Sequence, residues 1–255
     1  MIKEEKRFSS STLFEGMTSI RAVLSSENAG ARTIEKVLYD RAKEKTKAKE
    51  LGYLRRISSE RGFTVEAISS GGLDELAVGN THGGILALCT ERQFSAPSDA
   101  DIRADGFYAM IEGIEDPYNF GYALRSLYAA GVDGILLSPR NWMSAAGVVC
   151  RASAGASELV PIYIAEVEDT IELFKSKGYK VVCADIENSV SLYEADLKKP
   201  VFLIVGGEKR GISRSVLNAA DQIVRIDYGR EFKASLSAAS ASTVLAFEVY
   251  RQNRR

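Results

Sequence analysis

The residues best suited to chemistry lie in a late stretch where an apolar run ends in glycines. Val201 to Val205 reads VFLIV, and this β-branched run predicts a buried strand. Gly206 and Gly207 follow it directly and predict a tight turn. Because glycine has no Cβ, such a turn can admit a flat, largely uncharged ligand close to the backbone. A plain strand-to-helix turn explains the glycines equally well.

The spacing of these glycines excludes two common nucleotide-binding motifs. The dinucleotide fingerprint G-x-G-x-x-G joins the first strand and helix of a βαβ unit, whereas this chain has G-G-E-K-R-G late in its length. A phosphate-binding P-loop needs Lys and then Ser or Thr after its second glycine, but Ile212 and Ser213 follow Gly211. An unrelated nucleotide enzyme of the Rossmann type is therefore disfavoured.

Two other blocks place polar residues near the starts of predicted helices. The first block, residues 116–125, carries Asn119 and Arg125 in the pattern N-x-G-x-x-x-R. Asn119 could cap the free N–H groups of a helix, whereas Arg125 lies on an apolar flank that needs no arginine and predicts a phosphate or carboxylate partner. The second block is S-L-S-A-A, in which Ser235 could be a helix cap or a site residue.

In this order and spacing, the three blocks resemble the SpoU/TrmH family of the SPOUT superfamily, the knotted S-adenosylmethionine-dependent RNA ribose 2′-O-methyltransferases. The resemblance covers about residues 107–251. A weaker likeness to the family's ribosomal-protein-like RNA-binding module covers about residues 14–89, where Gly16 and the turn at His82 and Gly83 stand at matching places. The resemblance implies a trefoil knot, a homodimer formed through the C-terminal domain, and an RNA substrate, with rRNA favoured over tRNA.

The resemblance also implies roles for individual residues. Arg125 matches the catalytic arginine, which is proposed to take the proton from the ribose 2′-hydroxyl. A guanidinium is a poor base, with a pKa above ~12, so anchoring a phosphate beside the target ribose is the physically simpler role. Asn119, Glu208 and Ser235 match the other catalytic positions, although Glu208 could instead pair with a neighbouring basic residue at a helix start. The residues implied to bind S-adenosylmethionine are Gly206, Gly207, Gly211, Ile226, Tyr228, Ser235 and Leu236.

Two departures from the family pattern bear on activity. The family has Pro-Met where this chain has Asp227 and Tyr228, and Asn where it has Ser237. Serine offers one hydroxyl in place of an amide, so a contact between cofactor loop and catalytic residues can be lost. Asp227 either favours a cationic cofactor or pairs with Arg225 or Arg230. An alternative function is therefore a catalytically silent RNA-binding protein that retains the fold.

The composition indicates a globular protein without a membrane segment. The chain has 255 residues, of which 45% are hydrophobic and 26% charged. No apolar run approaches the ~20 residues of a membrane span, and the start lacks a signal-peptide core, so a cytoplasmic location is expected. Cys89, Cys150 and Cys183 are too few and too widely spaced for a disulfide framework or a zinc site. No metal site is expected, and His82, the one histidine, is interpreted as a turn residue.

The net charge of −1 hides an uneven distribution. Residues 41–61 carry eight Lys or Arg against three Glu. The segment has an apolar stripe typical of a helix. The excess charge is explained by a solvated helix face or by a surface presented to phosphates, and the sequence does not decide between them.

The order of predicted elements indicates an α/β protein with two domains. Residues 1–92 predict a small α/β unit, interpreted as an RNA substrate-binding domain, and residues 93–105 predict a linker. Residues 106–255, interpreted as the methyltransferase domain, alternate strands and helices. Such alternation predicts a parallel sheet covered on both faces, with ligands at the carboxyl ends of the strands. The strands are expected at 107–111, 135–137, 161–164, 179–184, 201–205 and 222–226. The helices of this domain are expected at 119–130, 143–152, 167–177, 213–220 and 235–251.

Overall fold

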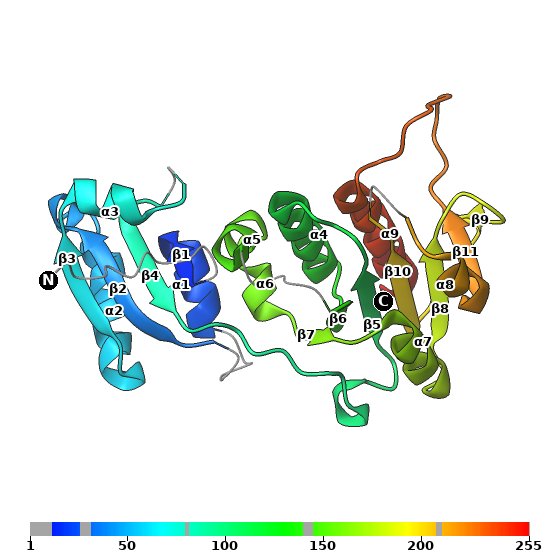
Figure 1. The fold of residues 1–255 in the computed structure, drawn as a ribbon, viewed down its shortest axis with the longest axis horizontal. Coiled ribbons are helices and arrows are strands. Elements are labelled where there is room, and N and C mark those ends of the chain that lie inside the picture. The colour runs from blue at the N-terminus through cyan, green and yellow to red at the C-terminus, as the bar shows by residue number, and fades with distance from the viewer. Residues whose placement is uncertain (1–11, 26–31, 80–81, 140–144, 208–210, 255) are drawn as a thin grey trace, which may run out of the picture. The chain divides into compact units, whose positions relative to one another are not determined.

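The computed structural model describes residues 12–25, 32–79, 82–139, 145–207 and 211–254. Its contacts divide the chain into two units (Figure 1). The N-terminal unit comprises Met1–Gln93 and Asn141–Leu159, and the C-terminal unit comprises Phe94–Arg140 and Val160–Arg255. The contacts of residues 145–159 therefore lie with the N-terminal unit, although the sequence assigned them to the second domain. The division into an RNA-binding and a catalytic domain stays a prediction.

The described part of the N-terminal unit has a four-stranded mixed sheet in the order β1-β4-β2-β3. β1 and β2 both pair antiparallel with β4, whereas β2 and β3 pair in parallel. The strands are β1 (Leu13–Glu15), β2 (Ile34–Asp40), β3 (Thr64–Ile68) and β4 (Ile85–Cys89). The helices are α1 (Gly16–Ser25), α2 (Ala48–Arg61), α3 (Ser70–Leu76), α5 (Ala146–Ala152) and α6 (Ala156–Leu159). α5 packs against β1, and α6 packs against α1.

The sequence suggested one helix over the basic segment 41–61, but the structure has two separate elements there. A short 3-10 helix (Arg41–Lys43) comes first, and α2 starts only at Ala48. The Asp40 carboxylate accepts the Ala42 N–H at 2.9 Å and the Ser70 hydroxyl at 2.8 Å, which holds the chain in a tight first turn. α2 ends at Arg61 and is capped by Gly62, whose φ of +79° suits glycine.

Two buried carboxylates of the N-terminal unit are paired with arginines. Glu158 lies 3.3 Å from Arg32 and 3.9 Å from Arg92, and all three side chains are almost fully buried. Glu15 forms an ion pair with Arg151 and accepts two backbone N–H groups from residues 78 and 79. Buried charges are tolerated only with such partners. These pairs also join segments of the unit that are distant in the chain.

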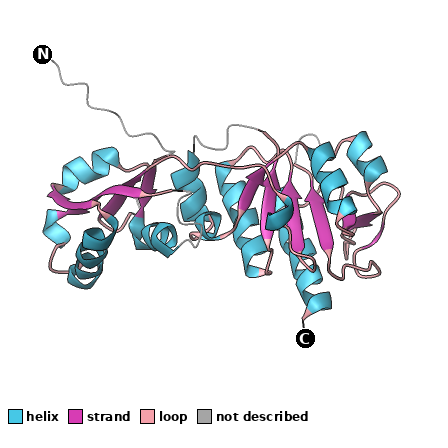
Figure 2. Ribbon diagram, turned by 90° about the horizontal axis from the view of Figure 1, so that it is seen from below, coloured by secondary structure: helices cyan, strands magenta, loops and turns pink. Residues whose placement is uncertain are grey.

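The described part of the C-terminal unit is built on a seven-stranded sheet in the order β7-β6-β5-β10-β8-β11-β9, and every pairing is parallel. The predicted parallel α/β sheet is therefore confirmed. Figure 2 shows these strands as one continuous sheet with helices beside it. The strands are β5 (Phe107–Ile111), β6 (Gly134–Leu137), β7 (Ile162–Ile164), β8 (Lys180–Ala184), β9 (Val190–Ser191), β10 (Val201–Val205) and β11 (Gln222–Arg225).

Helices cover both faces of this sheet. They are α4 (Pro117–Ala129), α7 (Val167–Ser176), α8 (Arg214–Ala219) and α9 (Ala238–Asn253). Because side chains alternate along a strand, Phe202 and Ile204 of β10 face one side, where they share a buried cluster with α7 and α8. α9 contacts β10 and packs along α4. The central strands β5 and β10 are buried throughout, as their apolar runs predicted.

The three cysteines are free and buried, as expected. Burial raises the pKa of the Cys150 and Cys183 thiols to about 12, so both stay protonated at neutral pH. Within the described ranges, no helix combines the length and the apolar character needed to cross a membrane.

Candidate active site

The carboxyl ends of β5 and β10 meet in a close contact between two glycines. Ile111 is aligned with Val205, and the Glu112 N–H donates to the Val205 carbonyl at 2.9 Å. One step further, a Cβ on Gly207 would lie 2.2 Å from the carbonyl oxygen of Gly113. Backbone packing therefore requires glycine at 207. Gly113 was not identified from the sequence, although a lone glycine two residues after a predicted strand was an available signal.

The predicted glycine turn is present after β10. Gly207 and Gly211 form an isolated antiparallel bridge, with the Gly211 N–H donating to the Gly207 carbonyl at 3.1 Å. A Cβ on Gly206 would lie 2.7 Å from the Gly211 carbonyl carbon, and Gly211 itself has a φ of +60°. The backbone therefore favours glycine at each of these three positions, because of close contacts at 206 and 207 and a positive φ at 211. Glu208, the expected catalytic carboxylate, lies outside the described residues.

The start of α4 differs from the sequence expectation. Asp116 is the N-cap, and its carboxylate accepts the Asn119 N–H at 2.8 Å. Pro117 occupies the first helical position, where its missing N–H costs nothing. The hypothesis that Asn119 caps this helix is therefore wrong. Its half-buried side chain lies three residues inside α4 and is not used for capping.

Arg125 lies on the exposed surface of α4, two turns after its start. It forms no ion pair with any residue in the described ranges. The next residue, Ser126, accepts a hydrogen bond from the Thr243 hydroxyl of α9 at 2.7 Å. Arg125 is thus carried by a helix that is fixed against α9, and its guanidinium is accessible to an anionic ligand.

The segment from β11 to α9 is a long loop, residues 226–237, that extends away from the sheet (Figure 1). Within it, the Leu236 N–H donates to the Tyr228 hydroxyl at 3.0 Å. Two of the expected cofactor-binding residues are therefore directly joined. Ile226 is half-buried, whereas Tyr228 and Leu236 are exposed by 40% and 36%. These side chains offer a partly exposed apolar surface.

Asp227 is engaged within the protein. It accepts a hydrogen bond from Ser191 and lies 2.8 Å from the Arg225 guanidinium. The Ser191 hydroxyl, and then the Arg225 charge, hold the pKa of the Asp227 carboxyl below its usual value. Of the two interpretations of this departure, pairing with Arg225 is the one observed.

The start of α9 is capped by Ser237, not by Ser235. The Ser237 hydroxyl accepts the Ser240 N–H at 3.2 Å. Serine and asparagine are nearly equivalent as caps, so the replacement of Asn by Ser at this position retains the helix start. Ser235 lies two residues before the cap and is exposed. The expectation that Ser235 caps the helix is wrong, and its hydroxyl plays no part in forming α9.

The expected site residues fall into two groups. The glycine turn and the 226–237 loop follow β10 and β11 and so lie at the carboxyl edge of the parallel sheet. Asn119 and Arg125 lie on α4, which follows β5 at the same edge. The packing of α4 along α9 connects the groups. No cluster of three His, Cys, Asp or Glu suited to a metal ion occurs among the residues that the structure describes.

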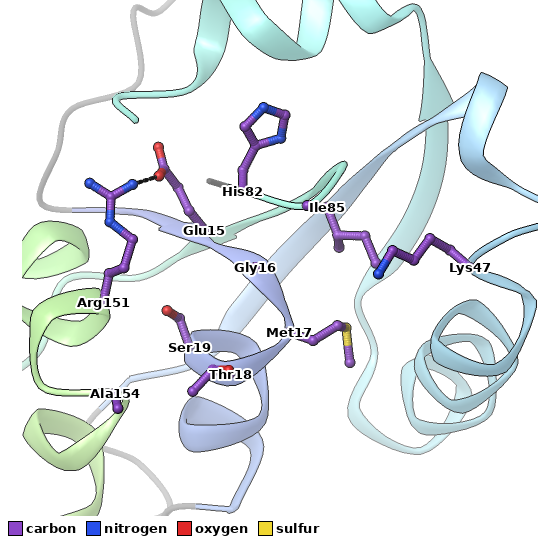
Figure 3. Close-up of a pocket in the computed structure, with 11 residues that line it drawn as sticks. Glu15, Gly16, Met17, Thr18, Ser19, Lys47, His82, Ile85, Arg151 and Ala154 are labelled. Carbon is purple, nitrogen blue, oxygen red and sulfur yellow. Dashed lines mark hydrogen bonds and ion pairs between the residues drawn. The ribbon is translucent and has the colours of Figure 1, made fainter. Parts of the chain in front are cut away.

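A separate cavity of about 300 Å³ lies within the N-terminal unit, between the start of α1 and the start of α2 (Figure 3). Its charged side chains are already paired. Lys47 lies 3.2 Å from Glu50, and Arg151 points to Glu15, to which it donates a hydrogen bond (Figure 3). This cavity therefore holds no free charge of the kind found at Arg125.

His82, at the rim of this cavity, has the structural role expected of it. Its Nδ1 accepts the Gly84 N–H at 3.2 Å, and its Nε2 lies 3.1 Å from Asp74. Both ring nitrogens are thus used to hold the turn before β4.

Comparison with known proteins agrees with this arrangement. The SpoU rRNA Methylase family matches residues 106–247. The 23S rRNA (guanosine-2′-O-)-methyltransferase RlmB of Shewanella oneidensis is 32% identical over 198 residues, covering 76% of this chain and 80% of that protein. A putative TrmH family tRNA/rRNA methyltransferase of Bacillus subtilis, YacO, is 27% identical over 77% of this chain and 80% of its own length.

Solved structures share the fold. The AdoMet-bound rRNA methyltransferase from Sinorhizobium meliloti superposes with a TM-score of 0.77 at 24% identity, covering 94% of this chain and 87% of that one. The SpoU methyltransferase AviRb from Streptomyces viridochromogenes, in complex with AdoMet, gives a TM-score of 0.73 at 23% identity over 94% of this chain and 89% of its own. With a matching family profile over more than half of its length, the chain belongs to the SpoU rRNA methylase family.

Proposed function

We propose that this protein transfers a methyl group from S-adenosylmethionine to a ribose 2′-hydroxyl of structured RNA, and that rRNA is favoured over tRNA. The observation that carries the proposal is that the glycine turn, the 226–237 loop and α4 all follow the carboxyl ends of strands in one parallel sheet, the edge where such folds bind ligands. The choice of rRNA is supported by the relative named as a 23S rRNA guanosine 2′-O-methyltransferase.

The residues that would hold the cofactor are Gly206, Gly207, Gly211, Ile226, Tyr228, Ser235 and Leu236. S-adenosylmethionine, when bound, supplies a methyl group carried by a positively charged sulfur. The chain's own contribution is glycines at 206, 207 and 211, which present no side chains, and partly exposed apolar side chains that follow β11 at the same edge of the sheet, which suit a flat adenine ring. Asp227 does not add a free negative charge to this surface, because Arg225 already pairs with it.

Arg125 is proposed to bind the phosphate next to the target ribose and to orient its 2′-hydroxyl. Its exposure and the fixed position of α4 support this role. Positioning and proton removal are what a protein must supply for transfer to oxygen. A guanidinium is a poor base, so proton acceptance by Arg125 itself is the weaker form of the proposal. Asn119, Ser235 and Glu208 complete the proposed catalytic set.

The test is transfer of label from methyl-labelled S-adenosylmethionine to unmodified 23S rRNA transcripts. We expect label in ribose that protects one phosphodiester from alkaline cleavage. Absence of label from every RNA, together with no cofactor binding by calorimetry, would remove the proposal. RNA binding that weakens with salt, without label, would support the catalytically silent alternative.

The finer features of the family belong to the same proposal. These are a trefoil knot, a ribosomal-protein-like RNA-binding N-terminal domain, a cytoplasmic location and a homodimer formed through the C-terminal domain. Exposed aromatic side chains on the packed helices α4 and α9 support the dimer, namely Tyr118, Tyr122, Tyr128, Phe247 and Tyr250. Tyr122→Glu should yield monomers in sedimentation, whereas Tyr193→Glu, at a still more exposed tyrosine outside these helices, should not.

A further inference from the structure

One face of α2 in the N-terminal unit carries positive charge that the fold does not use. Lys49, Gly52, Tyr53 and Arg56 are spaced three and four residues apart and so share this face. Lys49 and Arg56 are exposed and have no carboxylate partner within the described ranges. Glu60 lies one turn beyond Arg56 without forming an ion pair with it.

The acidic residues nearest this face are engaged elsewhere. Glu44 lies 2.7 Å from Arg55, and that hydrogen bond is the main reason why the pKa of Glu44 is lowered. Glu50 lies 3.2 Å from Lys47. Most carboxylates that could neutralise the segment are thus paired with other cations, and the face with Lys49 and Arg56 stays positive.

Two arginines are held against one aromatic ring on this face. The Arg21 guanidinium, from α1, lies 5.7 Å from the centre of the Tyr53 ring, and the Arg56 guanidinium lies 6.0 Å from it. Cation–π contacts at this distance restrict both side chains. Because both arginines are exposed, their N–H groups stay available to an outside acceptor.

Gly52 has no explanation in the folding of the unit. It lies in the interior of a 14-residue helix, where glycine is less favourable than any residue except proline. Its φ is not in the left-handed region, and a Cβ there would meet nothing within 4 Å. The missing side chain leaves the helix backbone open between Lys49 and Arg56, which allows another chain to approach closely.

We propose that the α2 face, defined by Arg21, Lys49, Gly52, Tyr53 and Arg56, docks the sugar–phosphate backbone of RNA. The choice of RNA as the partner rests on the proposed function. Phosphates accept the fork of N–H donors that a guanidinium presents. Lys49 and Arg56 of α2, together with Arg21 of α1 at the same Tyr53 ring, supply positive charge that attracts a phosphodiester strand. The surface would position the substrate; it belongs to the N-terminal unit, whereas the residues proposed to react belong to the C-terminal unit.

The first test removes the two held arginines from the full-length protein. Arg21→Gln/Arg56→Gln is compared with the wild type in filter binding to an unmodified 23S rRNA transcript over a salt series. We expect binding at least about 10-fold weaker at low salt. The slope of log K against log salt should fall in magnitude by about 1.5, for two phosphate contacts. Lys198→Gln/Arg214→Gln makes the same change in net charge on exposed residues of the C-terminal unit and should leave the slope unchanged.

The second test uses Gly52, where stability and binding should change in opposite directions. Gly52→Ala and Gly52→Gln both replace glycine by a better helix former, so both should raise the melting temperature. Gly52→Gln should weaken RNA binding several-fold because its side chain fills the approach, while Gly52→Ala should weaken it less.

The proposal is overturned if the double arginine variant keeps the wild-type affinity and salt slope, or if Gly52→Gln binds RNA as tightly as the wild type. A wild-type protein that binds no RNA overturns it as well. If the wild-type protein binds RNA but transfers no methyl group, the proposed activity is contradicted. The RNA binding of the arginine and Gly52 variants then still tests the α2 face.

Discussion

The two units of this chain differ in how much charge they bury. In the N-terminal unit, Glu158 and Glu15 are buried, and each is satisfied by arginine. In the C-terminal unit, the core is apolar and aromatic, with Phe174 and Phe202 stacked at 4.2 Å, while Arg125 is exposed on α4. Removing one partner of a buried pair leaves an uncompensated charge and destabilises the fold, whereas an exposed cation on a rigid element at a sheet edge is available to a ligand. Burial or exposure of a charged side chain thus distinguishes charges that maintain the fold from charges available to a ligand, without use of the family resemblance.

The largest effect expected from this contrast is loss of stability in Glu158→Gln. The change leaves Arg32 and Arg92 buried without their shared carboxylate, and breaking a buried pair in this way costs about 3–5 kcal/mol. Denaturant unfolding, with hydrogen exchange in β4 and α6 as a local measure, checks it. Glu187→Gln, which breaks the exposed pair with Arg214 at 3.2 Å, should cost less than about 1 kcal/mol. Equal unfolding midpoints for both variants would contradict the comparison.

Arg125→Ala should show the reverse pattern. We expect methyl transfer to fall ~100-fold or more, as when one preorganised electrostatic group is removed from an active site. Stability should change by no more than about 0.5 kcal/mol, because the side chain is exposed. Cofactor affinity, measured by calorimetry, should stay close to that of the wild type. Arg214→Ala, another exposed helical arginine, serves as the control and should keep full activity; full activity in Arg125→Ala would refute the proposed role.

Gly207→Ala tests the contact that builds the edge of the sheet. The added methyl group would lie 2.2 Å from the Gly113 carbonyl oxygen, so β5 and β10 must separate at their ends. Overpacking of this kind costs about 1–3 kcal/mol, and cofactor affinity should fall with it. Gly229→Ala, where a Cβ meets nothing within 4 Å, should be nearly neutral in thermal unfolding. Unchanged unfolding in Gly207→Ala would show that the glycine contact does not hold the edge.

The sequence predicted strands better than helix starts, for a physical reason. β5 and β10 were located to the residue because a strand buried on both faces reads as a continuous apolar run. At helix starts, several polar residues lie within reach of the same free N–H groups. Asp116 rather than Asn119, and Ser237 rather than Ser235, make the caps. Which residue does so depends on the backbone angles just before the helix, and composition does not reveal these angles.

Contacts between segments distant in the chain could not be predicted from the sequence either. Nothing local shows that residues 145–159 pack against β1 and α1, or that Gly113 lies against Gly207. The glycine turn itself was recognised, because glycines after an apolar run signal a turn. The sequence placed Arg125 on an apolar helix flank, which is wrong: Leu124 and Leu127 are buried, whereas Arg125 lies on the exposed face of α4. Residue types thus indicated the candidate site, and its supporting contacts required the fold.

The smallest expected effects separate the two serines before α9. Ser237→Ala removes the hydroxyl that accepts the Ser240 N–H and should cost about 1 kcal/mol. Ser237→Asn should retain stability, because asparagine caps as well as serine does. Ser235→Ala should leave unfolding unchanged, because Ser235 takes no part in the cap. It should lower methyl transfer, because Ser235 is one of the proposed site residues. Thermal unfolding and label transfer, measured on the same three variants, decide the matter. If Ser235→Ala lost as much stability as Ser237→Ala, Ser235 would have a structural role at the start of α9, and its proposed role in the site would be contradicted.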